Sequence, residues 1–360
     1  MSQNWQIFQG NTEPHDGIDR LLEIEAPSWR RFANSTVSAD SKSDDEYWQK
    51  LQEIAQTRLR DIIRGQSFRV PQLDSDPDKN QPTVVDAVNA ALYLRRPLLI
   101  TGKPGSGKTN LAYAIARELK LGPMLVWSVT ARSNLQQGLY QYDAIARLQD
   151  AQLSQTDASK HNYRNIGQYI RLGPIGTAFL PSQRPRVLLI DEVDKSDINL
   201  SNDLLNLLEE GRYEIPELRR LAKRGEAKQQ VESEDGLDVE IESGQVQCQA
   251  FPMVVMTSNG EREFSSAFLR RCVRVQMPTP EKAALTSIVK THLGNKLTAE
   301  FESVINEFVD RNKDNEVDLA TDQLLNTLYL LTQDFLTKDA DRKAIKKLLL
   351  GSLTSLGTGQ

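Results

Sequence analysis

The stretch from Gly102 to Thr109 reads GKPGSGKT and matches the pattern GxxxxGK[ST] at every specified position. Glycines let the backbone curl so that its N–H groups point at phosphate oxygens, and a following helix adds the positive end of its dipole. Lys108 supplies a cation for the β- and γ-phosphates, and the Thr109 hydroxyl is a hard oxygen ligand for Mg²⁺. We predict a nucleotide phosphate site rather than a chance turn, because a strand and a helix are predicted on its two sides. The predicted binding residues are Gly102, Lys103, Pro104, Gly105, Ser106, Gly107, Lys108, Thr109 and Asn110.

Two acidic residues, Asp191 and Glu192, come directly after the apolar run VLLI. Open α/β sheets bind ligands at the carboxyl ends of their strands. Asp191 is therefore predicted to hold Mg²⁺, directly or through water, and Glu192 to polarise the water that attacks the γ-phosphate. On its own such a pair fits a solvated cap equally well, and the phosphate motif upstream favours the catalytic interpretation. The acid-rich continuation from Val193 to Asp197 is predicted to be loop and helix cap.

A further apolar run and an arginine pair complete the candidate chemistry. Asn259 follows the run Met253 to Thr257 and can orient the attacking water or contact the γ-phosphate. The alternative is a simple turn, because an Asn-Gly dipeptide is common in turns. Arg270 and Arg271 suit the stabilisation of phosphoryl charge, often from a neighbouring subunit. By itself, a surface arginine pair favours solvation or salt bridges instead.

The elements that must position these residues alternate along the chain. Helices are predicted at 83–95, 109–120 and 199–210, and strands at 97–101, 124–128, 186–190 and 252–257. Such alternation favours a mostly parallel sheet covered by helices on both faces. From Pro280 onward the pattern is helical throughout. The polar stretch 219–242 is predicted to be an insertion with a hairpin or flexible tip and no strong apolar face.

The first 80 residues are less regular. Aromatic residues at Trp5, Phe8, Trp29 and Phe32 show no period, and the composition at 34–45 and at 70–82 is typical of linkers. A helix is predicted between them at 44–64, ended by Gly65. We therefore expect an N-terminal extension at 1–80, an α/β domain at 81–278 and a helical domain at 279–360.

The composition is that of an ordinary folded protein. The chain has 360 residues, 39% hydrophobic and 26% charged, which excludes collagen-like, disordered and disulfide-scaffold classes. With 44 basic and 49 acidic residues the net charge is -5, so general binding to nucleic acid is disfavoured. Neither of its two cysteines, Cys248 and Cys272, has partners at metal-ligand spacing. The sequence shows no leader and no membrane-spanning run, so we expect a cytoplasmic protein without a membrane partner.

Taken in order and followed by helices, these motifs resemble those of the AAA+ ATPases, and within them the MoxR-like group. The resemblance covers Thr83 to roughly Leu350. It implies an α/β P-loop NTPase fold with a parallel sheet covered by helices and a small C-terminal all-α lid domain. ATP and Mg²⁺ are the implied cofactors. By this likeness Lys108 and Thr109 belong to Walker A, Asp191 and Glu192 to Walker B, Asn259 is sensor 1, and Arg271 is the arginine finger, with Arg270 as second choice.

The resemblance also implies partners. Such proteins form rings, commonly hexamers, that act on protein clients, and a von Willebrand factor A-like partner is suggested. Insertions are implied in the second helix and before sensor 1, and 163–179 and 219–249 are long enough for them. One position departs from the family, since Asp322 stands where a sensor-2 arginine is expected. Either Arg311 substitutes for it, or coupling of the lid to nucleotide is weakened.

Three functions remain open from the sequence. The first is an oligomeric ATPase that remodels a protein partner. The second is a nucleic-acid-associated NTPase of restriction or clamp-loader type, motivated by basic clusters at 219–224 and 342–347. Given the acidic whole, solvated helix faces are the favoured explanation of these clusters. The third is a slow nucleotide-gated switch in a bacterial conflict system. Preference for ATP over GTP rests on the resemblance alone.

Overall fold

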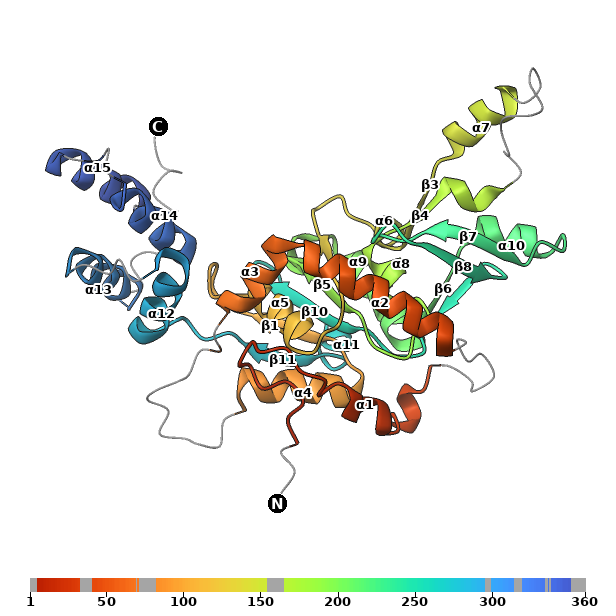
Figure 1. The fold of residues 1–360 in the computed structure, drawn as a ribbon, viewed down its shortest axis with the longest axis horizontal. Coiled ribbons are helices and arrows are strands. Elements are labelled where there is room, and N and C mark those ends of the chain that lie inside the picture. Colours follow the sequence, from red (N-terminus) through yellow and green to blue (C-terminus); the bar gives the residue numbers. More distant parts are fainter. Residues whose placement is uncertain are drawn as a thin grey trace.

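The computed structural model describes residues 5–32, 41–68, 70, 82–153, 165–294, 299–313, 319–333, 336 and 338–350 (Figure 1). Its centre is a five-stranded parallel sheet in the order β11-β1-β10-β5-β2. The strands are β1 (Leu98–Thr101), β2 (Leu125–Ser128), β5 (Val187–Asp191), β10 (Met253–Ser258) and β11 (Val273–Gln276). The predicted strands are present within one or two residues of their expected ends. The edge strand β11 was missed, because its alternation of half-buried and exposed residues gives no continuous apolar run.

Helices cover both faces of this sheet, as predicted. Successive strand residues point to opposite faces. Leu98, Ile100, Leu189 and Val255 pack with α4 (Val84–Leu94) and α5 (Lys108–Glu118). On the other face, Leu99, Leu188, Ile190 and Val254 pack with α8 (Pro174–Ala178) and α9 (Ile198–Glu210). Burial on both faces is why these strands are apolar throughout rather than alternating.

The two insertions form one arm that projects from the sheet, at the upper right of Figure 1. Its four strands lie in the order β3-β4-β7-β8. They are β3 (Tyr140–Tyr142), β4 (Ile170–Leu172), β7 (Lys228–Glu232) and β8 (Asp238–Glu242). The accompanying helices are α6 (Leu135–Leu139), α7 (Ala144–Leu153), η2 (Ile166–Tyr169) and α10 (Pro216–Ala222). A separate strand pair is formed by β6 (Arg212–Glu214) and β9 (Gln245–Gln247). The predicted hairpin is confirmed as β7 and β8. The expectation that it lacks an apolar face is wrong, since Val231 and Ile241 are buried in the core.

The N-terminal extension contains α1 (Asp19–Glu23), η1 (Ser28–Arg30), α2 (Ser41–Thr57) and α3 (Leu59–Ser67). The single helix predicted at 44–64 is therefore two helices that break at Arg58, and helix already begins inside the predicted linker 34–45. Gly65 does not end the helix. A Cβ at this position would lie 2.9 Å from the carbonyl oxygen of Tyr113, so glycine lets α3 pack closely on α5. The linker residues 33–40 and 71–81 lie outside the described residues.

Four helices follow the sheet and form the predicted all-α region, grouped at the left of Figure 1. They are α12 (Lys282–Leu293), α13 (Ala299–Lys313), α14 (Thr321–Leu331) and α15 (Asp339–Leu349). Leu285, Ile305, Phe308, Leu324 and Leu328 belong to a core of their own. In the part of the chain that is described, no helix has both the length and the apolar character needed to cross a bilayer.

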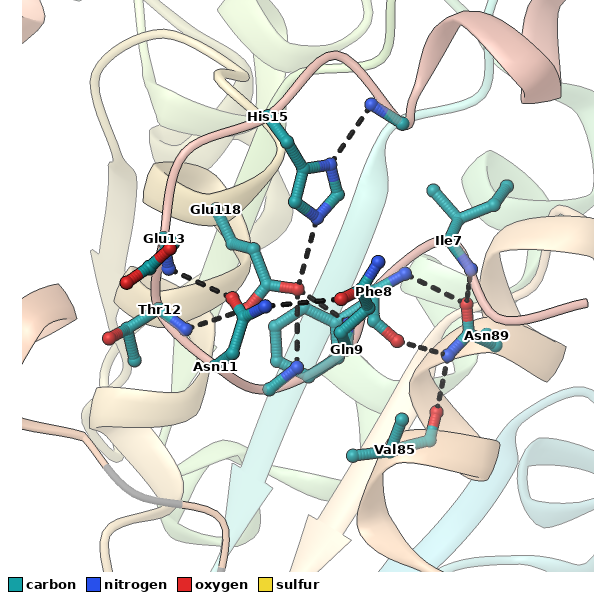
Figure 2. Close-up of polar contacts among 12 residues, drawn as sticks. Ile7, Phe8, Gln9, Asn11, Thr12, Glu13, His15, Val85, Asn89 and Glu118 are labelled. Carbon is teal, nitrogen blue, oxygen red and sulfur yellow. Dashed lines mark hydrogen bonds and ion pairs between the residues drawn. The ribbon is translucent and has the colours of Figure 1, made fainter. Parts of the chain in front are cut away.

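Two buried polar side chains hold the first described residues against the α/β domain (Figure 2). Asn89 of α4 accepts from the N–H groups of Ile7 and Phe8 at 2.6 and 2.9 Å and donates to the Phe8 carbonyl at 2.7 Å. Glu118, at the end of α5, is fully buried. Backbone outside helices and sheets needs such side-chain partners, because its N–H groups would otherwise be buried without acceptors.

Glu118 accepts from the backbone N–H groups of Gln9, Gly10 and Thr12 at 2.5, 3.2 and 3.0 Å. The Nε2 atom of His15 lies 3.4 Å from the same carboxylate. Its Nδ1 accepts from the N–H of Gly17 at 3.0 Å, which leaves the proton of a neutral ring on the nitrogen that faces Glu118. One carboxylate therefore ties residues 9 to 15 to the helix that begins in the phosphate loop.

We predict that Glu118→Ala destabilises the protein by about 2 kcal/mol, because one buried and two partly buried N–H groups lose their acceptor. The measurements are thermal unfolding and limited proteolysis, and we expect a lower Tm and faster cleavage before residue 20. Glu13→Ala is the matched control, since the Glu13 side chain is exposed. Equal proteolysis of both variants would show that Glu118 does not hold the segment.

Candidate nucleotide-binding site

The predicted phosphate loop lies in a cavity of about 470 Å³ between the sheet and the C-terminal helices. Its floor is the loop from Pro104 to Asn110. Asp191, Glu192, Thr257 and Asn259 line one side, and Ala284, Ile288, His292, Asp322 and Leu325 line the other. Parallel pairing of β1, β10 and β5 brings these side chains together, because their strands end at the same edge of the sheet.

The loop has the conformation that its glycines predict. Gly105 and Gly107 take φ values of 74° and 91°, which favour glycine. The Nζ of Lys108 donates to the carbonyl oxygens of Gly102 and Lys103 at 2.7 and 2.8 Å, inside the loop. Burial lowers the pKa of Lys108, and the carboxylates of Asp194, Asp191 and Glu192 oppose this shift. The buried Oγ of Ser106 has no hydrogen-bond partner among the described residues, as expected of a loop shaped for an added oxygen-rich group.

The predicted metal ligands are adjacent. Thr109 Oγ1 donates to Asp191 Oδ1 at 3.2 Å. Two hard oxygens at one point fit Mg²⁺, which usually takes one or two protein ligands and completes its shell with water and phosphate. Sequence reasoning missed Thr257, whose Oγ1 donates to Asp191 Oδ1 at 2.5 Å and accepts from the N–H of Glu192 at 2.9 Å. The Thr257 hydroxyl therefore contacts the carboxylate of Asp191 and the backbone of Glu192. Only the pairing of β10 with β5 reveals this position.

Glu192 and Asn259 face the cavity from neighbouring loops. Glu192 takes a left-handed φ of 58°, and its carboxylate accepts from Lys195 Nζ at 2.8 Å. Asn259 lines the cavity, and the chain bends at the next residue, Gly260, which has a φ of 81°. The two interpretations of this dipeptide are therefore compatible.

Asp194 is buried, and its role was not anticipated from the sequence. Its Oδ2 accepts from the backbone N–H groups of Asn259 and Glu261 at 2.9 and 3.0 Å. It lies in η3 (Val193–Lys195), one turn after the acids of β5. The carboxylate thus fixes the loop of Asn259 to the loop of Glu192. The helix cap predicted for this stretch is present at Asp197, which caps α9.

The extension and the C-terminal helices also contribute to the cavity. Ser67 and Phe68, at the end of α3, line it, and the Phe68 ring lies 3.6 Å from where a Cβ on Gly107 would be. A Cβ on Gly105 would lie 2.5 Å from the N atom of Thr321, so the start of α14 lies directly against the loop. Burial lowers the pKa of His292, which faces the cavity from α12.

Not every predicted residue belongs to this cavity. Asp322 lines it, whereas Arg311 does not and instead bonds to Glu307 and to the Leu350 carbonyl. Arg270 and Arg271 also lie outside its lining. Arg271 pairs with Glu209 of α9, and the Arg270 carbonyl accepts from Arg96 at 2.9 Å.

Residues 97–272 match the family described as AAA domain, dynein-related subfamily. This segment is similar to AAA domains. The match begins at β1 and ends beside Arg271, so it contains the whole candidate phosphate and metal site. The matched segment accounts for just under half of the chain. No curated protein matches the chain closely enough to count as a relative.

The chain also has a distant similarity to several solved structures. PCH-2 of C. elegans is 13% identical, with 86% of this chain and 68% of that chain covered and a TM-score of 0.34. NtrX from Brucella abortus, solved with ADP, is 14% identical, with 83% and 60% covered and a TM-score of 0.38. A P216G mutant of RuvB from Thermotoga maritima is 17% identical, with 73% of each chain covered and a TM-score of 0.33. At these identities and scores the likenesses carry no argument about activity.

We predict that Asp194→Ala lowers nucleotide hydrolysis about 10- to 100-fold, because loosening the Asn259 loop misplaces groups around the γ-phosphate. Asp194→Asn keeps one oxygen acceptor and is expected to retain more activity than the alanine variant. Nucleotide affinity, measured with a fluorescent analogue, should change little in the asparagine variant. Asp203→Ala, at an exposed position of α9, is the control. Full activity in Asp194→Ala would contradict a positioning role.

Proposed function

We propose that the chain is an ATPase that hydrolyses ATP to ADP and phosphate. The supporting observation is the convergence of Lys108, Thr109, Asp191, Glu192 and Asn259 on one cavity from three separate parts of the sequence. A phosphate loop, a metal pair, a carboxylate base and an amide are the parts that phosphoryl transfer to water requires. A surface cap or a simple turn would not bring all of them to one edge.

The chemistry follows from these positions. The N–H groups of the loop and Lys108 bind the β- and γ-phosphates, and Lys108 leaves its two carbonyl partners when it does so. Thr109 and Asp191 would hold Mg²⁺, which neutralises charge on the phosphates when bound. Glu192 takes a proton from water as the water oxygen bonds to the γ-phosphorus and the bond to the bridging oxygen of ADP breaks. Asn259 orients that water or the γ-phosphate.

The apolar part of the cavity suits a nucleobase. Phe68, Ala284, Ile288 and Leu325 come from the extension and from α12 and α14. An apolar, aromatic lining with few polar groups is typical of sites for flat heterocycles. The choice of adenine over guanine belongs to this proposal and draws on the AAA+ resemblance.

A shared active site accounts for Arg271. Its guanidinium lies outside the cavity of its own chain, so it can serve phosphate only in a neighbouring chain. We infer a ring, with a hexamer as the family expectation, that remodels a protein client in the manner of MoxR-like ATPases. A von Willebrand factor A-like partner and a cytoplasmic location are parts of the same proposal.

The nucleic-acid alternative has less support. Arg219 of the first basic cluster pairs with Glu214, and Arg342 of the second donates to the carbonyl oxygens of Leu331 and Leu336. These arginines have structural partners, although the other cations of both clusters leave the question to experiment. Hydrolysis that rises on addition of DNA at low salt, with steep salt dependence, would favour this alternative.

We expect ATPase activity per subunit to rise with protein concentration, because assembly supplies Arg271 to each site. Glu192→Gln should abolish turnover while nucleotide still binds. Arg271→Ala should lower kcat by about 10³-fold, the scale at which an arginine finger acts. The measurement is phosphate release across a protein dilution series. Activity that is flat with concentration and unaffected by Arg271→Ala would exclude the shared site.

A slow nucleotide switch is separated by the same assay. Asp322, which stands where a lid arginine is expected, motivates this alternative. A turnover below about one per second in the assembled protein, the low end of ordinary enzymes, would favour the switch.

A further inference from the structure

Arg271 is held in a defined orientation by its own chain. Glu209, in the last turn of α9, pairs with it through both carboxylate oxygens: Oε1 accepts from Nε, and Oε2 accepts from Nη2 at 2.9 Å. Nη1 donates to the Ala267 carbonyl at 3.0 Å. The pairing raises the pKa of Arg271 and lowers the pKa of Glu209, so both groups stay charged at neutral pH.

Guanidinium geometry makes this arrangement informative. An arginine has five N–H donors in one plane. Glu209 takes the side formed by Nε and Nη2, and Ala267 takes one N–H of Nη1, so three donors are used. One N–H on each terminal nitrogen has no partner among the described residues. Unpaired donors on two neighbouring guanidinium nitrogens are available for phosphate oxygens, which arginine commonly binds.

Glu209 is itself supported by the extension. Arg30 is buried and donates to the Leu208 carbonyl at 3.0 Å, one residue before Glu209. Its guanidinium also stacks on the rings of Phe32 and Phe251, at 4.6 and 4.7 Å. Burial lowers the pKa of Arg30 to about 10, which still leaves it cationic. The end of α9 is therefore held in place. The Glu209 carboxylate on it can fix the orientation of the Arg271 guanidinium.

We propose that Glu209 is a positioning residue that holds Arg271 with its two free donors directed outward, toward the phosphates of a neighbouring subunit. This inference rests on the proposed shared-site ATPase. A positioning role differs from a brake, because Glu209 occupies the side of the guanidinium that the phosphate does not need. Removing the carboxylate therefore lowers activity rather than raising it.

Mixed assemblies of two full-length variants test this proposal. The acceptor carries Arg271→Ala and keeps an intact nucleotide site, and the donor carries Glu192→Gln and keeps an intact arginine. Each alone is poorly active, and mixing them restores hydrolysis where the donor's arginine completes the acceptor's site. Glu209→Gln is then added to the donor or to the acceptor. Glutamine has the shape of glutamate but presents an NH₂ group to one guanidinium donor.

We expect Glu209→Gln in the donor to lower the restored activity about 10- to 100-fold, the cost of misplacing a catalytic group by about an ångström. The same change in the acceptor should leave the restored activity unaltered, since the acceptor supplies no arginine. Glu210→Gln in the donor is the matched control, because Glu210 is exposed and pairs with Arg212 at 3.1 Å. In the otherwise wild-type chain, Glu209→Gln should reduce kcat while KM for ATP stays the same.

The outcomes are separable. An equal loss with Glu209→Gln in either subunit would reveal a structural role and overturn the proposal. Full restoration with the change in the donor would show that Arg271 needs no positioning, and would leave the shared site standing. A parent mixture that restores no activity would instead remove the shared site, and the role of Glu209 with it.

Discussion

Parallel pairing of β1 with β10 and of β10 with β5 is the constraint on which the site depends. These strands are buried on both faces, so a shift in register would leave apolar side chains without packing partners. Because the register is fixed, the phosphate loop, Asp191 and Asn259 must leave the sheet at the same edge. The same pairing places the Thr257 hydroxyl within hydrogen-bond distance of Asp191. The polar chemistry is placed by apolar packing.

The N-terminal extension is bound to this framework by buried polar contacts. Glu118 and Asn89 accept hydrogen bonds from backbone N–H groups of the N-terminal segment, which lies outside helices and sheets. Arg30 donates to carbonyl groups at the ends of α4 and α9. Such groups are costly when unpaired, so each contact opposes release of the segment. The extension also delivers Phe68 to the cavity. The candidate nucleotide site and the extension consequently contact opposite ends of one helix, α5, which begins with Lys108 and ends with Glu118.

The sequence predicts those parts of the candidate site whose chemistry depends on backbone shape and on a local sequence pattern. The phosphate loop and the acids after β5 are of this kind, since a glycine pattern or an apolar run identifies them without knowledge of neighbours. Asp194, Thr257 and Phe68 depend on which strands and helices meet, and no local spacing reveals that. The break at Arg58 escaped notice because the apolar period continues through it. Gly65 illustrates the same limit, since its role is a close helix contact rather than a helix end.

The helix α9 gives the fold a direct link between two candidate functions. It begins six residues after Glu192 and reaches Glu210, a span of 13 residues and so about 20 Å. Its first turn follows the acid proposed to activate water, and its last turn carries the carboxylate that pairs with Arg271. A rigid helix cannot shift at one end alone. Glu192 precedes the start of this helix and Glu209 lies in its last turn, where Arg30 holds the Leu208 carbonyl from the extension. The positions of the two glutamates are therefore set by one element.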